Sequence, residues 1–130
     1  MQHIIDTHTF LWFEDESEKL PTYVRNLIKD PANTMQISIA SFWEIGIKAS
    51  TGKLSLTTSL LGLQAIAESQ SIEILPITVQ AISVVQQFPF HHKDPFDRII
   101  AATVLTRGGV LLSADTIFDA YGVPRTWQEG

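Results

Sequence analysis

The sequence predicts an α/β fold with three layers, α/β/α, in which helices cover both faces of a central parallel sheet of four to five strands. Short apolar runs alternate with longer segments whose apolar residues recur at helical spacing. The run 110–112 is apolar at every position, which is typical of a strand buried on both faces. Parallel strands need long crossover connections, and the helices between them supply these.

The first half of the chain begins with a strand over residues 3–7, where an apolar run ends in a polar pair. A helical turn starts near Phe10, because apolar residues then recur at helical spacing. Pro31 and Gly52 mark the ends of two later helices. The further expected elements are a helix over 21–29, a strand over 35–39, a helix over 41–50, a helix over 60–69 and a strand over 72–75.

The second half of the chain continues with a helix over 78–87, capped by its first residue, a threonine. Another helix begins at Pro95, because proline suits the first helical turn and Asp94 before it has the side chain of an N-cap. A pair of glycines at 108–109 ends that helix. The expected elements after it are a strand over 110–112, a helical turn over 116–121 and an edge strand over 123–127.

Length and composition are those of one globular domain. The chain has 130 residues, 45% of them hydrophobic, and no repeat or low-complexity linker divides it, so we expect a single domain over 1–130. The absence of cysteine excludes thiol catalysis and cysteine-rich zinc sites. The first ten residues have neither a basic segment nor a long apolar run, so we expect no signal peptide, no membrane span and a cytoplasmic protein.

The charge balance bears on the class of partner. A net charge of −5 argues at first against nucleic acid, because proteins that bind nucleic acid usually present a basic surface. If four of the acids gather in one metal site, however, the remaining surface is nearly neutral. The charge balance then permits a nucleic-acid substrate without suggesting one.

Four carboxylates are expected at the carboxyl edge of the sheet, where ligands of such folds bind. Asp6 ends the first strand and Asp115 follows the buried fourth strand. Glu44 and Asp97 are expected in the first turns of helices that start at the same edge. Carboxylates in one cleft repel each other, so their convergence makes sense mainly around a cation.

Each acid also has a purely structural interpretation. The two aspartates at strand ends can cap the helical turns that follow them, and Asp97 can favour the dipole of its helix. Glu44 has the spacing of a capping box with Ser41 and that of an ion pair with Lys48. For any one acid both interpretations stay open, and only the joint placement favours a site.

Four sequence blocks carry a resemblance to a known family. They are Asp6-Thr7-His8, Phe42-Trp43-Glu44-Ile45 with Lys48, His92-Lys93-Asp94-Pro95-Phe96-Asp97-Arg98, and Ser113-Ala114-Asp115. In this order, and over essentially the whole chain, the sequence resembles PIN-domain proteins, most closely the VapC-like branch of ribonuclease toxins. The resemblance implies a PIN-like fold and a Mg²⁺- or Mn²⁺-dependent endoribonuclease that hydrolyses RNA phosphodiester bonds. It also implies a homodimer and a cognate antitoxin protein.

The resemblance further implies a role for each of these acids. Asp6, Asp97 and Asp115 would bind the metal ion, and Glu44 would bind a second ion or orient the attacking water. Hard divalent cations take oxygen ligands of this kind. Because a bound ion would lower the pKa of a water molecule and hold the phosphate, in-line attack on a phosphodiester would need no protein nucleophile. The catalytic residues would be Asp6, Glu44, Asp97 and Asp115.

Five residues are expected to support this site. Thr7 and Ser113 are close enough in sequence to the acids to hydrogen-bond them, and Asp94 caps its helix. Lys48 is the expected partner of the glutamate, and Arg98 would contact either phosphate or a site acid.

Other side chains have weaker signals. His91 and His92 could contact RNA or act as bases, although loop histidines more often do neither. Trp12, Trp43 and Phe96 are expected to pack against apolar neighbours, including a subunit interface, with stacking on bases as the alternative.

Two other functions fit parts of the sequence. A phosphotransferase of the haloacid-dehalogenase type uses an aspartate at the end of its first strand as nucleophile, but it needs a second acid two residues later, where this chain has His8. A non-catalytic PIN-like module that binds nucleic acid or protein would have lost one or more of the acids, and all four are present.

Overall fold

A central sheet organises the computed structural model, which describes residues 1–89 and 93–128. Its strands are β1 (Gln2–Ile5), β2 (Thr34–Ser38), β3 (Ile72–Leu75), β4 (Val110–Leu112) and β5 (Arg125–Thr126). These five strands, found within the described residues, lie in the order β3-β2-β1-β4-β5, and all neighbouring strands are parallel. The predicted parallel sheet is therefore confirmed.

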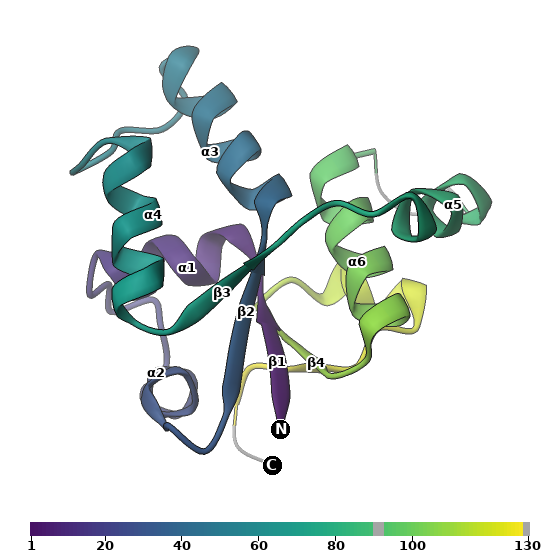
Figure 1. The fold of residues 1–130 in the computed structure, drawn as a ribbon, viewed down its shortest axis with the longest axis horizontal. Coiled ribbons are helices and arrows are strands. Elements are labelled where there is room, and N and C mark those ends of the chain that lie inside the picture. The colour runs from purple at the N-terminus through teal and green to yellow at the C-terminus, as the bar shows by residue number, and fades with distance from the viewer. Residues whose placement is uncertain (90–92, 129–130) are drawn as a thin grey trace.

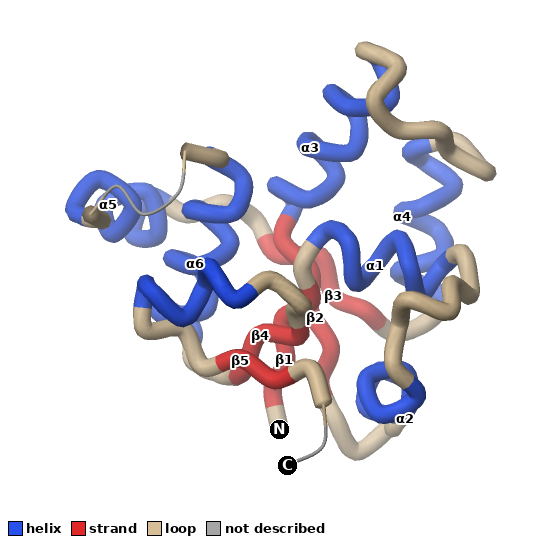
Figure 2. The backbone as a smooth tube through the Cα atoms, turned by 180° about the vertical axis from the view of Figure 1, so that it is seen from behind, coloured by secondary structure: helices blue, strands red, loops and turns tan. Residues whose placement is uncertain are grey.

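Helices cover both faces of this sheet, as Figures 1 and 2 show from opposite sides. They are α1 (Thr7–Glu14), α2 (Thr22–Lys29), α3 (Ile39–Ser50), α4 (Leu60–Ser69), α5 (Val79–Gln87), α6 (Pro95–Arg107) and the 3-10 helix η1 (Thr116–Tyr121). α1, α2 and α4 cover one face, whereas α6 and η1 cover the other, where α5 packs against α6. α3 follows β2 directly and extends beyond the end of the sheet (Figure 1). Within the described part of the chain, no helix is both long and apolar enough to cross a membrane.

Two apolar cores hold the three layers together, one on each face of the sheet. Successive residues of a strand point to opposite faces, so the neighbours Ile4 and Ile5 of β1 enter different cores. Ile5 packs with Phe10 of α1 on one face, and Ile4 packs with Ile100 of α6 on the other. All four side chains are fully buried. Burial on both faces explains why the strands are apolar throughout instead of alternating with polar residues.

β1 lies where the order of the strands reverses, because β2 and β3 extend the sheet on one side of it and β4 and β5 on the other. Ile5, the last residue of β1, aligns with Ile37 of β2 and with Leu112 of β4. Asp6 and Ser113, which follow these strands, therefore leave the sheet at the same edge. In parallel sheets such a switch point is the usual place for a functional site.

The helix predicted over 41–50 begins earlier than expected, at Ile39. Ser38 is its N-cap, because the Ser38 hydroxyl accepts a hydrogen bond from a backbone amide of the first turn. Ser41 therefore lies inside the helix and Glu44 lies in its second turn. The predicted capping box between Ser41 and Glu44 is wrong, and so is the placement of Glu44 in the first turn.

The ends of some other elements also differ from expectation. The strand predicted over 3–7 ends at Ile5, because Asp6 caps the helix that starts at Thr7. The edge strand predicted over 123–127 is confined to Arg125–Thr126, since it pairs only with the short strand β4.

Gly109 allows β4 to approach β1. Its φ is +99°, and a Cβ atom at this position would lie 2.7 Å from the carbonyl oxygen of Gln2. Gly109→Ala should lower the free energy of unfolding by about 3 kcal/mol, because it combines backbone strain with a clash against backbone atoms. Urea denaturation followed by circular dichroism measures this loss.

Gly122→Ala is the matched control for that experiment. Gly122 also has a positive φ, +74°, but a Cβ atom there would meet nothing within 4 Å. Gly122→Ala should lower the free energy of unfolding by only about 1 kcal/mol, because alanine is strained only by the left-handed backbone conformation. Equal losses in the two variants would show that the contact with Gln2 is not the constraint.

Candidate active site

Asp6 leaves the carboxyl end of β1 and is almost fully buried. Its Oδ1 accepts hydrogen bonds from the amide (2.9 Å) and the hydroxyl (2.5 Å) of Thr9, so Asp6 is the N-cap of α1. Its Oδ2 accepts a hydrogen bond from the hydroxyl of Ser113 (2.5 Å), which follows β4. Asp6 therefore joins the two strands at the switch point. Burial raises the pKa of Asp6, while the hydrogen bonds from Ser113 and Thr9 act in the opposite direction.

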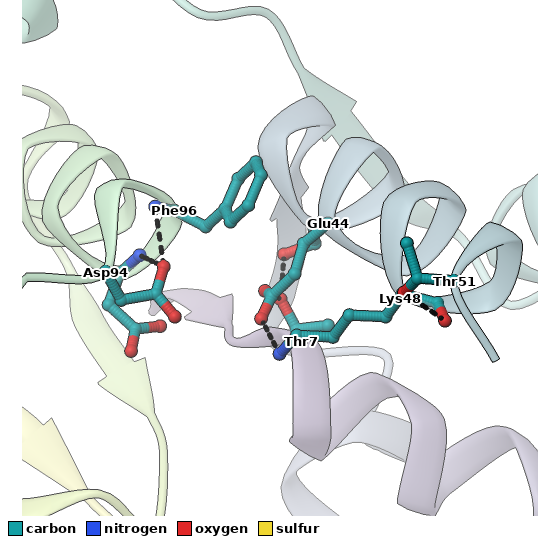
Figure 3. A network of polar contacts seen from close by, with 8 residues as sticks. Thr7, Glu44, Lys48, Thr51, Asp94 and Phe96 are labelled. Carbon is teal, nitrogen blue, oxygen red and sulfur yellow. Dashed lines mark hydrogen bonds and ion pairs between the residues drawn. The ribbon is translucent and has the colours of Figure 1, made fainter. Parts of the chain in front are cut away.

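Glu44 reaches the same edge of the sheet from α3 and is only 2% exposed. Its Oε1 accepts a hydrogen bond from the hydroxyl of Thr7 (2.6 Å), and the hydroxyl oxygen of Ser41 lies 2.9 Å from that of Thr7. Its Oε2 lies 2.5 Å from Nζ of Lys48, one helical turn further along α3. The predicted ion pair is therefore present, and it raises the pKa of Lys48. Figure 3 shows Thr7 and Lys48 beside the Glu44 carboxylate.

Asp94 and Asp97 lie at the N-terminus of α6. The Oδ1 atom of Asp94 accepts hydrogen bonds from the amides of Phe96 (2.8 Å) and Asp97 (3.3 Å), so the predicted N-cap is confirmed. Asp97 lies in the first turn, where the helix dipole favours a negative charge. In Figure 3, Asp94 and Glu44 project from α6 and α3 toward the space between these helices.

Asp115 follows β4 and caps η1, because its Oδ1 accepts a hydrogen bond from a backbone amide of that helix (3.0 Å). Its own amide donates to the Ser113 hydroxyl oxygen (3.0 Å), which in turn donates to Asp6. Arg125 of β5 secures this segment, since it donates to the carbonyl of Ser113 (3.1 Å) and pairs with Asp119 (3.0 Å). A chain of hydrogen bonds therefore fixes two acids from opposite ends of the sequence.

The predicted acids converge on one region, because all of them act on the ionisation of Asp97. Partial burial raises the pKa of Asp97 to about 8, and nearby negative charges contribute to this rise. In decreasing order of effect, these charges belong to Asp94, Glu44, Asp6 and Asp115. Five carboxyl groups from four segments of the chain thus share one electrostatic environment.

The chemistry of these groups fits a hard divalent cation. Carboxylates are the ligands that Mg²⁺ and Mn²⁺ prefer, and four further carboxyl groups act with burial to raise the pKa of Asp97. Among the described residues, no group of three or more His, Cys, Asp and Glu side chains is close enough together to hold an ion. Binding of a cation would therefore draw these carboxylates closer to one another.

The predicted supporting residues that lie among the acids include Thr7, Lys48, Asp94 and Ser113. Arg98 makes a contact that the sequence does not predict, because its Nη2 donates to the carbonyl of Val85 (3.2 Å) in α5. His91 and His92 lie outside the described residues, so their roles stay predictions.

Two contributors to the site escape the sequence analysis. The contact of Thr9 with Asp6 could have been predicted, because Thr9 lies three residues after Asp6, where a backbone amide donates to the side chain of an N-cap residue. No sequence pattern predicts the contact of Arg125 with Ser113, because it depends on the pairing of β4 with β5.

Comparison with known proteins places this arrangement among relatives. The sequence model of the PIN-domain family matches residues 3–124. Ribonuclease VapC22 of Mycobacterium tuberculosis is 26% identical over 125 residues, which cover 94% of this chain and 93% of that protein.

Solved structures share the fold at low sequence identity. VapBC2 from Rickettsia felis, bound to a DNA fragment from its promoter, has a TM-score of 0.71 at 14% identity, covering 97% of this chain and 98% of that chain. FitAB bound to the IR36 DNA fragment has a TM-score of 0.68 at 18% identity, covering 98% and 97%. VapBC-1 from nontypeable Haemophilus influenzae has a TM-score of 0.67 at 17% identity, covering 97% of each chain. These matches confirm the three-layer fold.

Asp97→Asn should make the metal-free protein more stable at high pH. In the unfolded chain the Asp97 carboxyl ionises near the ordinary pKa of 3.8, whereas in the folded chain it keeps its proton up to about pH 8. Between these values the folded state binds more protons, so the stability of the wild type falls as pH rises, and the variant lacks this loss.

Urea denaturation in excess chelator measures this effect. From about pH 6 to about pH 9, the gain in free energy of unfolding from Asp97→Asn should grow by roughly 1–2 kcal/mol, after allowance for solvent screening. Glu68→Gln, an exposed change on α4, is the control and should show no such trend. A gain that does not vary with pH would contradict the raised pKa of Asp97.

Proposed function

The chain belongs to the PIN-domain family, and on this premise we propose that it is a metal-dependent endoribonuclease, the toxin of a toxin-antitoxin pair. The convergence of Asp6, Glu44, Asp97 and Asp115 at the switch point of the sheet carries this proposal. The likeness to ribonuclease VapC22 supports the choice of RNA as substrate. In this proposal residues 1–130 act as a single PIN domain in the cytoplasm.

We assign the metal ion, Mg²⁺ or Mn²⁺, to Asp6, Asp97 and Asp115. Such an ion, when bound, lowers the pKa of a water molecule and neutralises charge on a phosphate. Asp97 must give up its proton before it can bind a cation, so its raised pKa couples metal binding to pH. In this scheme Glu44, which contacts Thr7 and Lys48, orients the attacking water. No side chain needs to act as a nucleophile in this scheme.

A basic cavity beside the acids supports RNA as the substrate. It has a volume of about 370 Å³ and lies between the end of α3 and the start of α6. Lys48, Lys53 and Lys93 line it together with Asp94. Three of the nine lysine and arginine residues of this acidic chain therefore line the same cavity as Asp94. Lysine side chains attract the phosphates that flank a cleavage point.

An antitoxin protein is the proposed partner of this toxin. VapBC and FitAB, which share the fold, are named as two-component assemblies, and this likeness supports the assignment. The carboxylates gathered around Asp97 would attract a basic side chain of such a partner. A basic segment in this position would block access to the acids.

We also propose that the chain forms a homodimer through an apolar surface of α3, α5 and α6. A cavity of about 270 Å³ on this surface is lined by apolar side chains, among them Trp43, Ile82 and Phe96. Trp43 is 60% exposed and Ile82 is 51% exposed, although both are large and apolar. Clustered apolar exposure of this kind is typical of a protein interface.

Sedimentation velocity tests the homodimer. The wild type should sediment as a dimer and Trp43→Glu as a monomer, because a charge in an apolar interface is costly to bury. Leu61→Glu is the matched control, since Leu61 is 76% exposed on α4 and should leave the dimer intact. A monomeric wild type would exclude the homodimer, and a dimeric Trp43→Glu variant would exclude this interface.

Cleavage of a mixed RNA pool tests the enzymatic proposal. The purified chain should cut RNA with Mg²⁺ or Mn²⁺ and lose this activity in excess chelator. Asp6→Asn and Asp97→Asn should lower the rate by about a hundredfold or more, because each removes a charge that holds the ion. Asparagine keeps the shape of the side chain, so circular dichroism should report an unchanged fold.

Two controls accompany the cleavage experiment. Glu68→Gln changes an exposed acid of α4 and should cut RNA like the wild type. Addition of the protein encoded next to this chain should inhibit cleavage if that protein is the antitoxin. Activity that persists equally in both aspartate variants would refute the assigned metal site, and binding of RNA without any cleavage would favour a non-catalytic module.

A further inference from the structure

A second cavity touches the acids from the side of α1. It has a volume of about 230 Å³ and is lined by Asp6, His8, Trp12, Ala114 and Asp115. Two of these residues belong to the proposed metal site, whereas His8 and Trp12 have no role in the scheme described above. The cavity therefore joins the acids directly to a pair of rings.

The helical spacing of α1 places both rings on this cavity. His8 and Trp12 are four residues apart, so they occupy the same face of the helix, one turn from each other. Their ring centroids are 5.8 Å apart and the ring planes are inclined by 37°. Phe10 and Phe13 lie on the other side of α1, where they are buried in the core. The core thus holds α1 in place while His8 stays exposed and Trp12 is half-buried.

Two contacts fix the position of the Trp12 ring. The ring of Trp127, which follows β5, lies 5.8 Å from it between centroids. The Nζ atom of Lys19 lies 6.0 Å from the centroid of the same ring, at the limit of a cation–π contact. A ring held from several sides loses little conformational freedom when a ligand stacks on it.

The charges around the cavity select its ligand. Apart from the phosphate that a bound cation would hold, Asp6 and Asp115 disfavour a further anion in the cavity. A nucleobase is uncharged and planar, and it gains most from stacking on an aromatic ring. Lys19, which is exposed and lies near the Trp12 ring, supplies a positive charge for a neighbouring phosphate of the same RNA.

We propose that His8 and Trp12 form a subsite for one unpaired nucleobase of the RNA substrate, next to the phosphate that the acids cleave. This inference rests on the proposed ribonuclease function and deepens it. The subsite requires a substrate that is single-stranded at the point of cleavage, because a base paired in a helix does not expose its face. His8 and Trp12 thus position the substrate and take no part in the chemistry.

Binding of fluorescein-labelled RNA oligonucleotides tests the subsite. Anisotropy measured with Ca²⁺ in place of Mg²⁺ gives the Kd, and a gel checks that the RNA stays intact. A series of oligonucleotides carries one abasic nucleotide at successive positions. For the wild type, loss of the base at one position should weaken binding about tenfold, and loss elsewhere should have little effect.

Protein variants identify the ring that the base contacts. His8→Ala and Trp12→Leu should each weaken binding of the intact RNA by about five- to tenfold. For these variants, removal of the base at the sensitive position should raise the Kd by less than about twofold, because the ring on which that base stacks is already missing. His8→Phe should bind like the wild type, since it keeps an aromatic face. His8→Ala is exposed on α1 and serves as the decisive variant if Trp12→Leu disturbs the fold.

The outcomes separate this inference from the proposed function. Cleavage with Mg²⁺ combined with equal Kd values for wild type and His8→Ala would overturn the subsite and leave the ribonuclease standing. RNA that binds through His8 but is never cut would overturn the ribonuclease and leave the subsite. Failure of RNA to bind would overturn the subsite. Weaker binding of a basic peptide by His8→Ala, without weaker binding of RNA, would assign the rings to a protein partner and also overturn it.

Discussion

Mutual repulsion among carboxylates at the carboxyl edge of the sheet is the constraint on which the rest of this structure depends. Five acidic side chains share an environment in which partial burial, together with the charges of the other four, raises the pKa of Asp97 to about 8. Such an arrangement costs stability unless positive charge or hydrogen bonds offset it. The N-terminus of α6, the ammonium group of Lys48 and the hydroxyls of three residues supply part of this compensation. The gathering of these carboxylates is what makes the region fit for a cation.

Structural and functional interpretations of the acids turn out to be compatible. Asp6, Asp94 and Asp115 are helix N-caps, as their positions in the sequence suggest, and all three also act on the charge of Asp97. A parallel fold explains this double role, because helices that follow strands begin at the edge where ligands bind. Capping fixes each carboxylate in direction, and convergence of the helix starts brings the carboxylates together.

The surroundings of the acids differ on their two sides. Lysines of α3 and of the segment before α6 line one cavity, whereas rings of α1 line the other. In the proposed function the first side attracts phosphates and the second holds a base, with the acids between them. The exposed apolar surface around Trp43 lies on α3, α5 and α6, and among the described residues its cavity has a different lining from the cavity beside the rings of α1.

By itself, the sequence determined the order of helices and strands, the caps at Asp94 and Asp115, and the acids that belong to one edge of the sheet. These features follow from local patterns, in which neighbouring residues decide where an element starts and ends. Only the tertiary structure decided that Glu44 depends on Thr7, 37 residues away, and that Asp6 depends on Ser113, 107 residues away. It also showed that Ser41 lies inside α3, because the competing cap Ser38 is fixed by the end of β2. The raised pKa of Asp97 likewise arises from burial and from charges on four separate segments, and both exist only once the sheet has brought those segments together.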